Sequence, residues 1–296
     1  MGGRINIQKK MKNIKIFAKS LFLLRPRFVS IILFIFILYG IGWALSQPLL
    51  LLNFEKEKLS LIGTIYTFLL FLFFLPYWFY VRWNISRTWA LLGITKDKLL
   101  KNIFHFSQGI LFSLVLIILI LIPILKSNYI DITGEINSEV IKQTLFYILG
   151  LGFAEEIFFR GWLFEELKIQ FGTKPAMIGQ ALLYSFVHYI SDTTFWNIIG
   201  LRLGWFLLGI LLSLIRRKDE GSLWKSIGIH GGLVGIWYFL NEVFIKISVD
   251  TPSYLVGPFT DNLSNPLGSL CGIGLLLILC ILFSRKSKKP ISQLFK

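Results

Sequence analysis

Long apolar stretches separated by short polar ones run through the whole chain. A stretch of about 20 mostly apolar residues is long enough to cross a bilayer as an α-helix, and the pattern predicts eight such spans. Their expected ranges are 28–46, 60–81, 107–125, 140–164, 174–191, 197–215, 224–245 and 264–284. We therefore expect an all-α fold, a polytopic transmembrane helix bundle of about eight spans.

The polar stretches between these spans are too short to hold a soluble domain. We expect a basic N-terminal segment, cytoplasmic or interfacial, over residues 1–27 and a three-span region over 28–139. The core that carries the candidate chemistry is predicted over 140–245. A last span and a basic cytoplasmic tail are expected over 246–296.

Composition supports a membrane protein and predicts its orientation. Of the 296 residues, 55% are hydrophobic, and the formal net charge is +15. Placing alternate loops on opposite sides puts 25 of the 31 Lys and Arg residues on the side of the N-terminus and 4 on the other. Because basic residues collect in cytoplasmic loops, both termini are predicted to be cytoplasmic. We assign the charge to topology and to anionic membrane lipids, and we expect no nucleic acid partner.

Three places inside the predicted spans carry ionisable groups that the apolar pattern does not explain. The stretch "AEEIFFRGW" (154–162) holds two glutamates and an arginine, and His188 and His230 lie in later spans. A charged side chain in a span costs about 2.5–3.5 kcal/mol on insertion scales, so it indicates a function. At a helical rise of about 1.5 Å per residue, Glu155, His188 and His230 all lie about 15 to 21 Å from the ends of their spans.

Helix geometry separates the two glutamates. Glu156 and Arg160 are four residues apart, so they share a helix face, and we expect them to form a structural ion pair. Glu155 is rotated by about 100° from its neighbour. It is therefore left for a partner on another helix.

A carboxylate and two imidazoles that meet in a dry cavity can activate water. Glu155 would take a proton from the water, assisted by one histidine, and the other histidine would stabilise the oxyanion formed on a peptide carbonyl. The alternative is that Glu155, His188 and His230 ligate a divalent metal such as zinc, which acidifies the water. No HExxH signature is present, and the residues alone leave the metal open.

These residues resemble a known family. "EEIFFR" (155–160) resembles the EExxxR motif of the CPBP intramembrane proteases, which include type II CAAX prenyl endopeptidases, bacteriocin self-immunity proteins and lysostaphin-resistance-like proteins. "YSFVH" (184–188) resembles the second motif of the family, FxxxH, and "HGGLV" (230–234) resembles the third, HxxxN or HxxxB. The order and spacing of the motifs fit over 140–245.

The resemblance implies a role for each matched residue. Glu155 corresponds to the glutamate that activates water, assisted by His188, and His230 corresponds to the histidine on the oxyanion side. Glu156 and Arg160 correspond to the structural part of the first motif. The implied reaction is CAAX-type hydrolysis near the C-terminus of a membrane-associated peptide or lipid-anchored protein.

Two positions depart from the motifs. Tyr184 replaces a phenylalanine, and we expect that change to be harmless. Val234 stands where the best-studied branch has asparagine, and valine cannot donate a hydrogen bond to an oxyanion. An alternative function is therefore a catalytically weak membrane scaffold or immunity protein that binds a partner through the same cavity. A transporter or proton relay, which would also use buried Glu and His, ranks last.

Two further expectations concern location and one stray charge. The loop-poor chain with lysine-rich edges is typical of a bacterial inner-membrane protein, and "HGGLV" is also similar to cyanobacterial and plastid members, which would place it in a thylakoid membrane. Arg202 lies near the outer end of the sixth predicted span, and we expect its side chain to snorkel to the interface.

Overall fold

The computed structural model confirms an all-α fold. It describes residues 19–95, 99–126, 130–131, 136–188, 190, 193–248, 250–260 and 263–285. Most of the predicted basic N-terminal segment and of the basic tail lies outside these residues. The chain forms two compact units, Met1–Trp89 and Ala90–Lys296.

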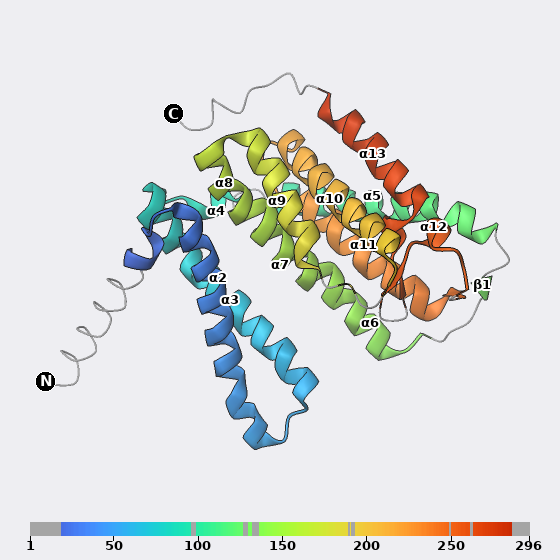
Figure 1. Cartoon of the computed structure of the whole chain (residues 1–296), viewed down its shortest axis with the longest axis horizontal. Coiled ribbons are helices and arrows are strands. Elements are labelled where there is room, and N and C mark those ends of the chain that lie inside the picture. Colours follow the sequence, from blue (N-terminus) through green and yellow to red (C-terminus); the bar gives the residue numbers. More distant parts are fainter. Residues whose placement is uncertain are drawn as a thin grey trace, which may run out of the picture. The chain divides into compact units, whose positions relative to one another are not determined.

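The first unit is a helical hairpin (Figure 1, blue). Its elements are α2 (Arg27–Ser46), η1 (Gln47–Leu52) and α3 (Lys56–Trp83). The chain reverses at Asn53, which adopts the left-handed conformation (φ 59°) that asparagine tolerates better than most residues. Phe34 of α2 stacks on Trp78 of α3, with ring centroids 4.6 Å apart. The short helix α4 (Thr88–Leu91) follows.

The second unit holds the remaining elements. Its long helices are α5 (Leu99–Leu125), α9 (Thr173–Val187), α10 (Phe195–Lys218), α11 (Trp224–Val243) and α13 (Leu270–Ser284). Between α5 and α9 lie α6 (Ser138–Leu145), η2 (Phe146–Leu151), α7 (Gly152–Glu156), η3 (Ile157–Leu163) and α8 (Phe164–Phe171). The short elements are β1 (Ile130–Asp131), β2 (Lys246–Ile247), α12 (Ser253–Val256), β3 (Phe259–Thr260), β4 (Leu263–Ser264) and η4 (Pro266–Gly268). β1 pairs with β2, and β3 with β4, as two antiparallel ribbons.

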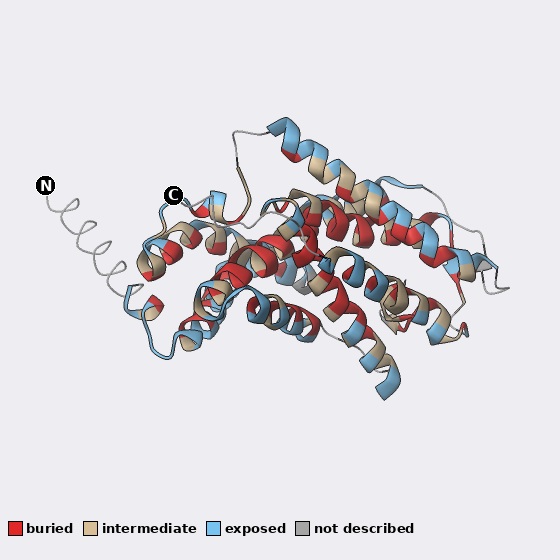
Figure 2. Cartoon of the chain, turned by 90° about the horizontal axis from the view of Figure 1, so that it is seen from above, coloured by how far each residue is buried: buried red, intermediate tan, exposed pale blue. Residues whose placement is uncertain are grey.

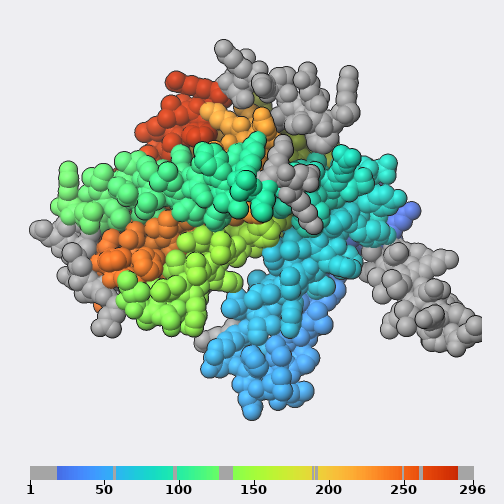
Figure 3. All heavy atoms as spheres, turned by 180° about the vertical axis from the view of Figure 1, so that it is seen from behind, coloured from blue at the N-terminus to red at the C-terminus, as the bar shows by residue number. Residues whose placement is uncertain are grey.

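Helix α11 is the centre of this unit. It packs against α5 along one side, against α6, η2 and α7 along another, and against α10. Figure 2 shows buried residues gathered in the middle of the bundle, and Figure 3 shows α5 (green) crossing one face of it. Eleven of its 20 residues are buried, and His230 is one of them.

Elements α6 to α8 form one continuous helical run. The Asn137 side chain caps its start by accepting a hydrogen bond from the Val140 backbone N–H (2.9 Å), and Gly172 (φ 85°) ends it. The two π-helical segments η2 and η3 flank α7, which carries both glutamates of the first motif. Segments of this kind occur frequently at functional sites.

The number of membrane spans stays a prediction. Each of the eight predicted spans overlaps a helical segment, although the eighth, 264–284, begins before its helix α13 at Leu270. Within the described residues only four helices are long and apolar enough to cross a bilayer. These are Arg27–Leu52, Lys58–Trp83, Leu99–Leu125 and Phe195–Lys218. The fifth predicted span, 174–191, is too long: α9 ends at Val187, and His188 has an extended backbone (φ −72°, ψ 125°).

Two glycines bring the first motif close to α11. A Cβ atom added at Gly152 would lie 2.7 Å from the Gly231 Cα atom, and one added at Gly231 would lie 2.1 Å from the Ile148 carbonyl oxygen. Both distances are far shorter than a van der Waals contact. The helical run and α11 can approach this closely only because both positions lack a side chain.

We predict that Gly231→Ala separates α11 from the helical run. The new methyl group meets backbone, which cannot rotate away, so the variant should lose about 1–3 kcal/mol of stability, as overpacked cores do. Thermal unfolding in detergent measures this loss. Gly274→Ala in α13 is the control, because no atom lies within 4 Å of its added Cβ. Equal melting temperatures for the two variants would contradict the prediction.

Candidate active site

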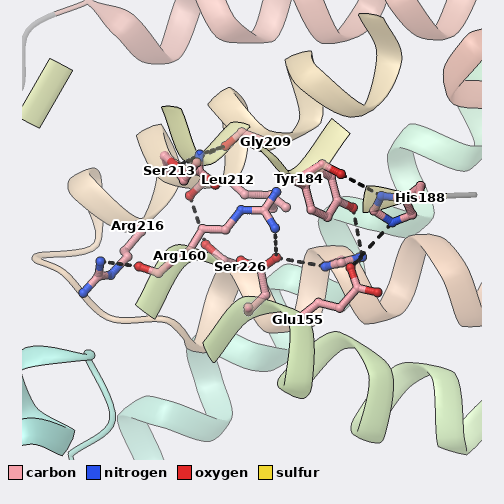
Figure 4. A network of polar contacts seen from close by, with 12 residues as sticks. Glu155, Arg160, Tyr184, His188, Gly209, Leu212, Ser213, Arg216 and Ser226 are labelled. Carbon is pink, nitrogen blue, oxygen red and sulfur yellow. Dashed lines mark hydrogen bonds and ion pairs between the residues drawn. The ribbon is translucent and has the colours of Figure 1, made fainter. Parts of the chain in front are cut away.

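The three motifs meet around one carboxylate oxygen. Glu155 Oε2 lies 3.7 Å from His188 Nε2 and 3.6 Å from His230 Nε2. The glutamate comes from α7, His188 follows α9, and His230 lies in α11. Figure 4 shows Glu155, Tyr184 and His188 directed toward the same space. The structure thus brings together the three residues that the sequence analysis singled out.

Glu156 has two partners, of which only one was predicted. Its Oε1 atom lies 2.9 Å from Arg160 Nη1, and both side chains are fully buried. The same oxygen accepts a hydrogen bond from His230 Nδ1 (2.9 Å). The ion pair is confirmed, but the carboxylate also fixes the His230 ring. With Nδ1 held by Glu156, Nε2 is directed toward Glu155.

The His188 ring is held by its own helix and by α10. Its Nδ1–H donates to the Tyr184 carbonyl oxygen at 2.7 Å, so Nε2 is the nitrogen that faces Glu155. The ring stacks on Trp205 with the centroids 4.5 Å apart and the planes 25° from parallel. The bond to Tyr184 also explains why α9 stops at Val187, since the ring satisfies a carbonyl that a further helical turn would use.

Arg202 does not act as predicted. Its Nη1 atom donates to the carbonyl oxygens of Ser185 and His188, the latter at 3.0 Å, and the Ser185 hydroxyl donates to the Arg202 carbonyl at 2.8 Å. The side chain therefore caps the C-terminal end of α9, where cations are favoured, in place of snorkelling to the interface. It holds the backbone on which the His188 ring is mounted.

The two departures from the motifs both lie in the site. Tyr184 is 1% exposed, and its hydroxyl oxygen lies 3.2 Å from His230 Nε2. The Arg160 guanidinium carbon lies 4.1 Å from the centroid of the Tyr184 ring. Whether the change to tyrosine is harmless stays a prediction, but the added hydroxyl contacts a site histidine. Val234 lines the cavity beside them and offers it no polar group.

The site opens into a cavity of about 390 Å³. Its walls are mostly aliphatic and aromatic, with few polar groups, as is usual for a pocket that binds a ligand. The lining residues are Ile117, Ile120, Tyr147, Leu151, Glu155, Tyr184, His188, Trp205, Leu208, His230, Leu233, Val234, Trp237, Tyr238 and Leu263–Leu267. Glu155 is the only Asp, Glu, Lys or Arg among them.

A metal site was the open alternative. Among the residues that the structure describes, no three His, Cys, Asp or Glu side chains are grouped so that they could hold a metal ion. In addition, His230 Nε2 already has the Tyr184 hydroxyl at 3.2 Å. The arrangement does not fit a bound metal, and we derive no step through one.

Comparison with known families agrees with the motifs. Residues 137–236 match the model of the type II CAAX prenyl endopeptidase Rce1-like family, and this stretch contains all three motifs. It is an intramembrane protease domain of the CPBP family. Residues 8–87 of this protease match a separate model, a domain of unknown function (DUF8676). No curated protein and no solved structure matches the chain.

The matched domain defines the protein at a coarse level. The chain is an integral membrane protein with the domain of a protease, and a membrane-associated protein is the class of substrate that such a domain implies. The CPBP domain lies wholly within the second unit, and the DUF8676 match lies within the first. The described site residues all belong to the second unit.

We predict that Glu156→Gln destabilises the CPBP domain strongly. It leaves the Arg160 guanidinium buried beside a neutral partner, and breaking a buried ion pair costs about 3–5 kcal/mol. Chemical unfolding in detergent measures the loss. Glu139→Gln is the matched control, because Glu139 pairs with Lys142 at the surface of the same helical run, where pairs are worth about 0–1 kcal/mol. Equal unfolding midpoints would show that Glu156 is not a structural anion.

We predict that Arg202→Met releases the His188 ring. Without the cap on α9, the Nδ1 bond to Tyr184 should weaken, and a misplaced catalytic group can lower kcat by about 100-fold. Nitrogen NMR of the imidazoles reports the tautomer directly, and the chain has only three histidines to assign. Arg217→Met, in the last turn of the same helix, is the control. An unchanged His188 signal in Arg202→Met would contradict this role.

Proposed function

We propose that the CPBP domain hydrolyses a peptide bond of a membrane-associated or lipid-anchored protein with water activated by Glu155. One observation carries the proposal. Glu155 Oε2 is buried without a hydrogen-bond partner among the described residues, and it faces the Nε2 atoms of both site histidines. A buried carboxylate oxygen is rarely left unpaired, and the 3.6–3.7 Å separations suit a bridging water better than direct hydrogen bonds.

The first step would form a tetrahedral intermediate. Glu155 takes one proton from the water, and His188 Nε2 accepts a hydrogen bond from it, as the Nδ1–H bond to Tyr184 allows. The water oxygen attacks the peptide carbonyl carbon, and the carbonyl oxygen becomes an oxyanion. His230, held by Glu156, donates a hydrogen bond to that oxyanion.

The second step would break the peptide bond. The protonated Glu155 gives its proton to the leaving nitrogen, the C–N bond breaks, and the products are a carboxylic acid and an amine. One positioned side chain thus acts first as a base and then as an acid, as in other hydrolases. Glu156 is held by Arg160 and His230 and takes no part in these proton transfers.

The topology and the membrane belong to the proposal. We propose that the N- and C-termini are cytoplasmic, as the distribution of basic residues indicates, and that the protein lies in a bacterial inner membrane or a thylakoid membrane. Membrane lipids would surround the exposed apolar faces of α2, α3 and α5. The cavity would receive the substrate from the membrane and not from solution.

A second function is favoured by one residue. Val234 lines the cavity at the position where a hydrogen-bond donor would assist the oxyanion. A chain without that donor could retain the cavity for binding alone. It would then act as a membrane scaffold or an immunity protein that holds a partner in the same cavity.

We predict that Glu155→Gln abolishes cleavage. Losing a general base costs about 10²–10⁴ in rate, and glutamine keeps the size of the side chain. The assay uses the purified protein in detergent with a quenched fluorescent library of C-terminal peptides, with and without a lipid on a cysteine. His188→Ala should also be inactive, and Glu242→Gln, exposed in the last turn of α11, is the control.

The result also separates the alternatives. Every lane is repeated with a strong zinc chelator, and unchanged cleavage is expected. Loss of activity with the chelator would establish a metal and overturn the water mechanism proposed here. Full activity of Glu155→Gln would overturn the role of the glutamate. No cleavage by folded wild-type protein would favour the scaffold.

A further inference from the structure

A protease that works through an oxyanion needs hydrogen-bond donors where the negative charge develops, and removing one donor typically costs about 10²–10³ in kcat. In this site His230 is one donor, and Val234, one helical turn further along α11, cannot be another. Position 184, on α9, also departs from the family motif, and there the departure adds a donor. Tyr184 carries a hydroxyl that the phenylalanine of the motif lacks, and it lines the same cavity as Val234.

The Tyr184 hydroxyl is held next to the reacting groups. Its oxygen lies 3.2 Å from His230 Nε2, which itself lies 3.6 Å from Glu155 Oε2. The phenol ring makes edge contacts with His188 (4.7 Å between centroids) and Phe159 (5.1 Å). Packed in this way, the side chain has little freedom beyond rotation of its O–H bond.

The direction of that O–H bond depends on His230. Its Nδ1–H is bound to Glu156, so a ring with a single proton accepts the Tyr184 hydrogen at Nε2. A ring with protons on both nitrogens donates to the tyrosine oxygen and leaves the phenolic hydrogen free for another acceptor. The direction of donation thus switches with one proton.

The formal charges around His230 do not balance on their own. The site holds two carboxylates, the half-buried Glu155 and the buried Glu156, and one buried guanidinium, Arg160. The His230 ring lies 2.9 Å from one carboxylate and 3.6 Å from the other. A ring with protons on both nitrogens would balance the formal charges of this cluster, and buried charges are tolerated when they are balanced and hydrogen-bonded.

We propose that Tyr184 is a catalytic residue whose hydroxyl donates a hydrogen bond to the oxyanion, in place of the donor that Val234 lacks. The inference rests on the proposed peptide hydrolysis and adds a residue to it. With substrate bound, His230 Nε2–H and the Tyr184 O–H would both donate to the oxyanion, so the tyrosine adds a second donor beside the histidine. Tyrosine and valine then form a matched pair of substitutions that moves the donor from α11 to α9.

The ring and the hydroxyl can be tested separately. Tyr184→Phe removes one oxygen atom and keeps the ring that packs against His188 and Arg160. The variant therefore keeps any structural contribution of the ring and removes only the contribution of the hydroxyl. Tyr254→Phe is the control, because Tyr254 is 63% exposed in α12 of the same unit.

The experiment measures kcat and KM for wild type, Tyr184→Phe, Val234→Asn and the double variant on one cleaved peptide. We expect Tyr184→Phe to lower kcat at least tenfold with KM within a factor of two, because the donor acts only in the transition state. In the Tyr184→Phe background, Val234→Asn should restore at least half of the loss in log kcat. In the wild-type background it should give a smaller gain, because a donor is already present.

Three results would overturn the proposal. They are an unchanged kcat in Tyr184→Phe, a change confined to KM, and an equal effect of Val234→Asn in both backgrounds. If Val234→Asn does not fold, as thermal unfolding would show, the kcat of Tyr184→Phe decides alone. These results differ from a failure of the proposed function, in which wild type does not cleave or Glu155→Gln does.

Discussion

The site depends on one buried carboxylate that two helices share. Glu156 Oε1 lies 2.9 Å from Arg160 Nη1 and 2.9 Å from His230 Nδ1, and the three side chains are almost completely buried. A carboxylate can be kept in such a place only when cationic or hydrogen-bonding groups surround it. The contact with His230 connects the first motif to the third and holds that histidine opposite Glu155, and the contact with Arg160 balances the charge of the carboxylate.

The apolar packing of the second unit is arranged to permit that connection. Gly152 and Gly231 let the helical run and α11 approach to a separation that any side chain would prevent. On the other side, the end of α9 is tied to α10 by Arg202 and Ser185, with Trp205 against the His188 ring. Polar ties at the helix ends and small residues at the crossing together place three ionisable groups in one cavity.

The sequence predicted which residues share the site and one local ion pair, but not the long-range contacts that hold the site residues in place. A spacing of four residues was enough to find the pair of Glu156 and Arg160, because helical geometry is regular. The bond from Glu156 to His230 and the contact from Tyr184 to His230 join residues 74 and 46 positions apart, and no periodicity encodes them. The end of α9 was misplaced because the His188 ring binds the Tyr184 carbonyl, a contact that apolar patterning cannot show.

The need to bring ionisable groups and closely packed helices together also explains which helices have the length and composition of membrane spans. The four that pass by length and composition carry none of the three groups that meet at the cavity. The segments that do carry them are short, as α9 is with 15 residues, interrupted by π-helical turns, or rich in glycine and polar residues, as α11 is. A helix that must present a glutamate or a histidine and approach its neighbour closely gives up apolar bulk at those positions. The apolar pattern of a membrane span is therefore weakest in the segments that carry the site residues, and apolar side chains of the same unit line the cavity around the half-buried Glu155.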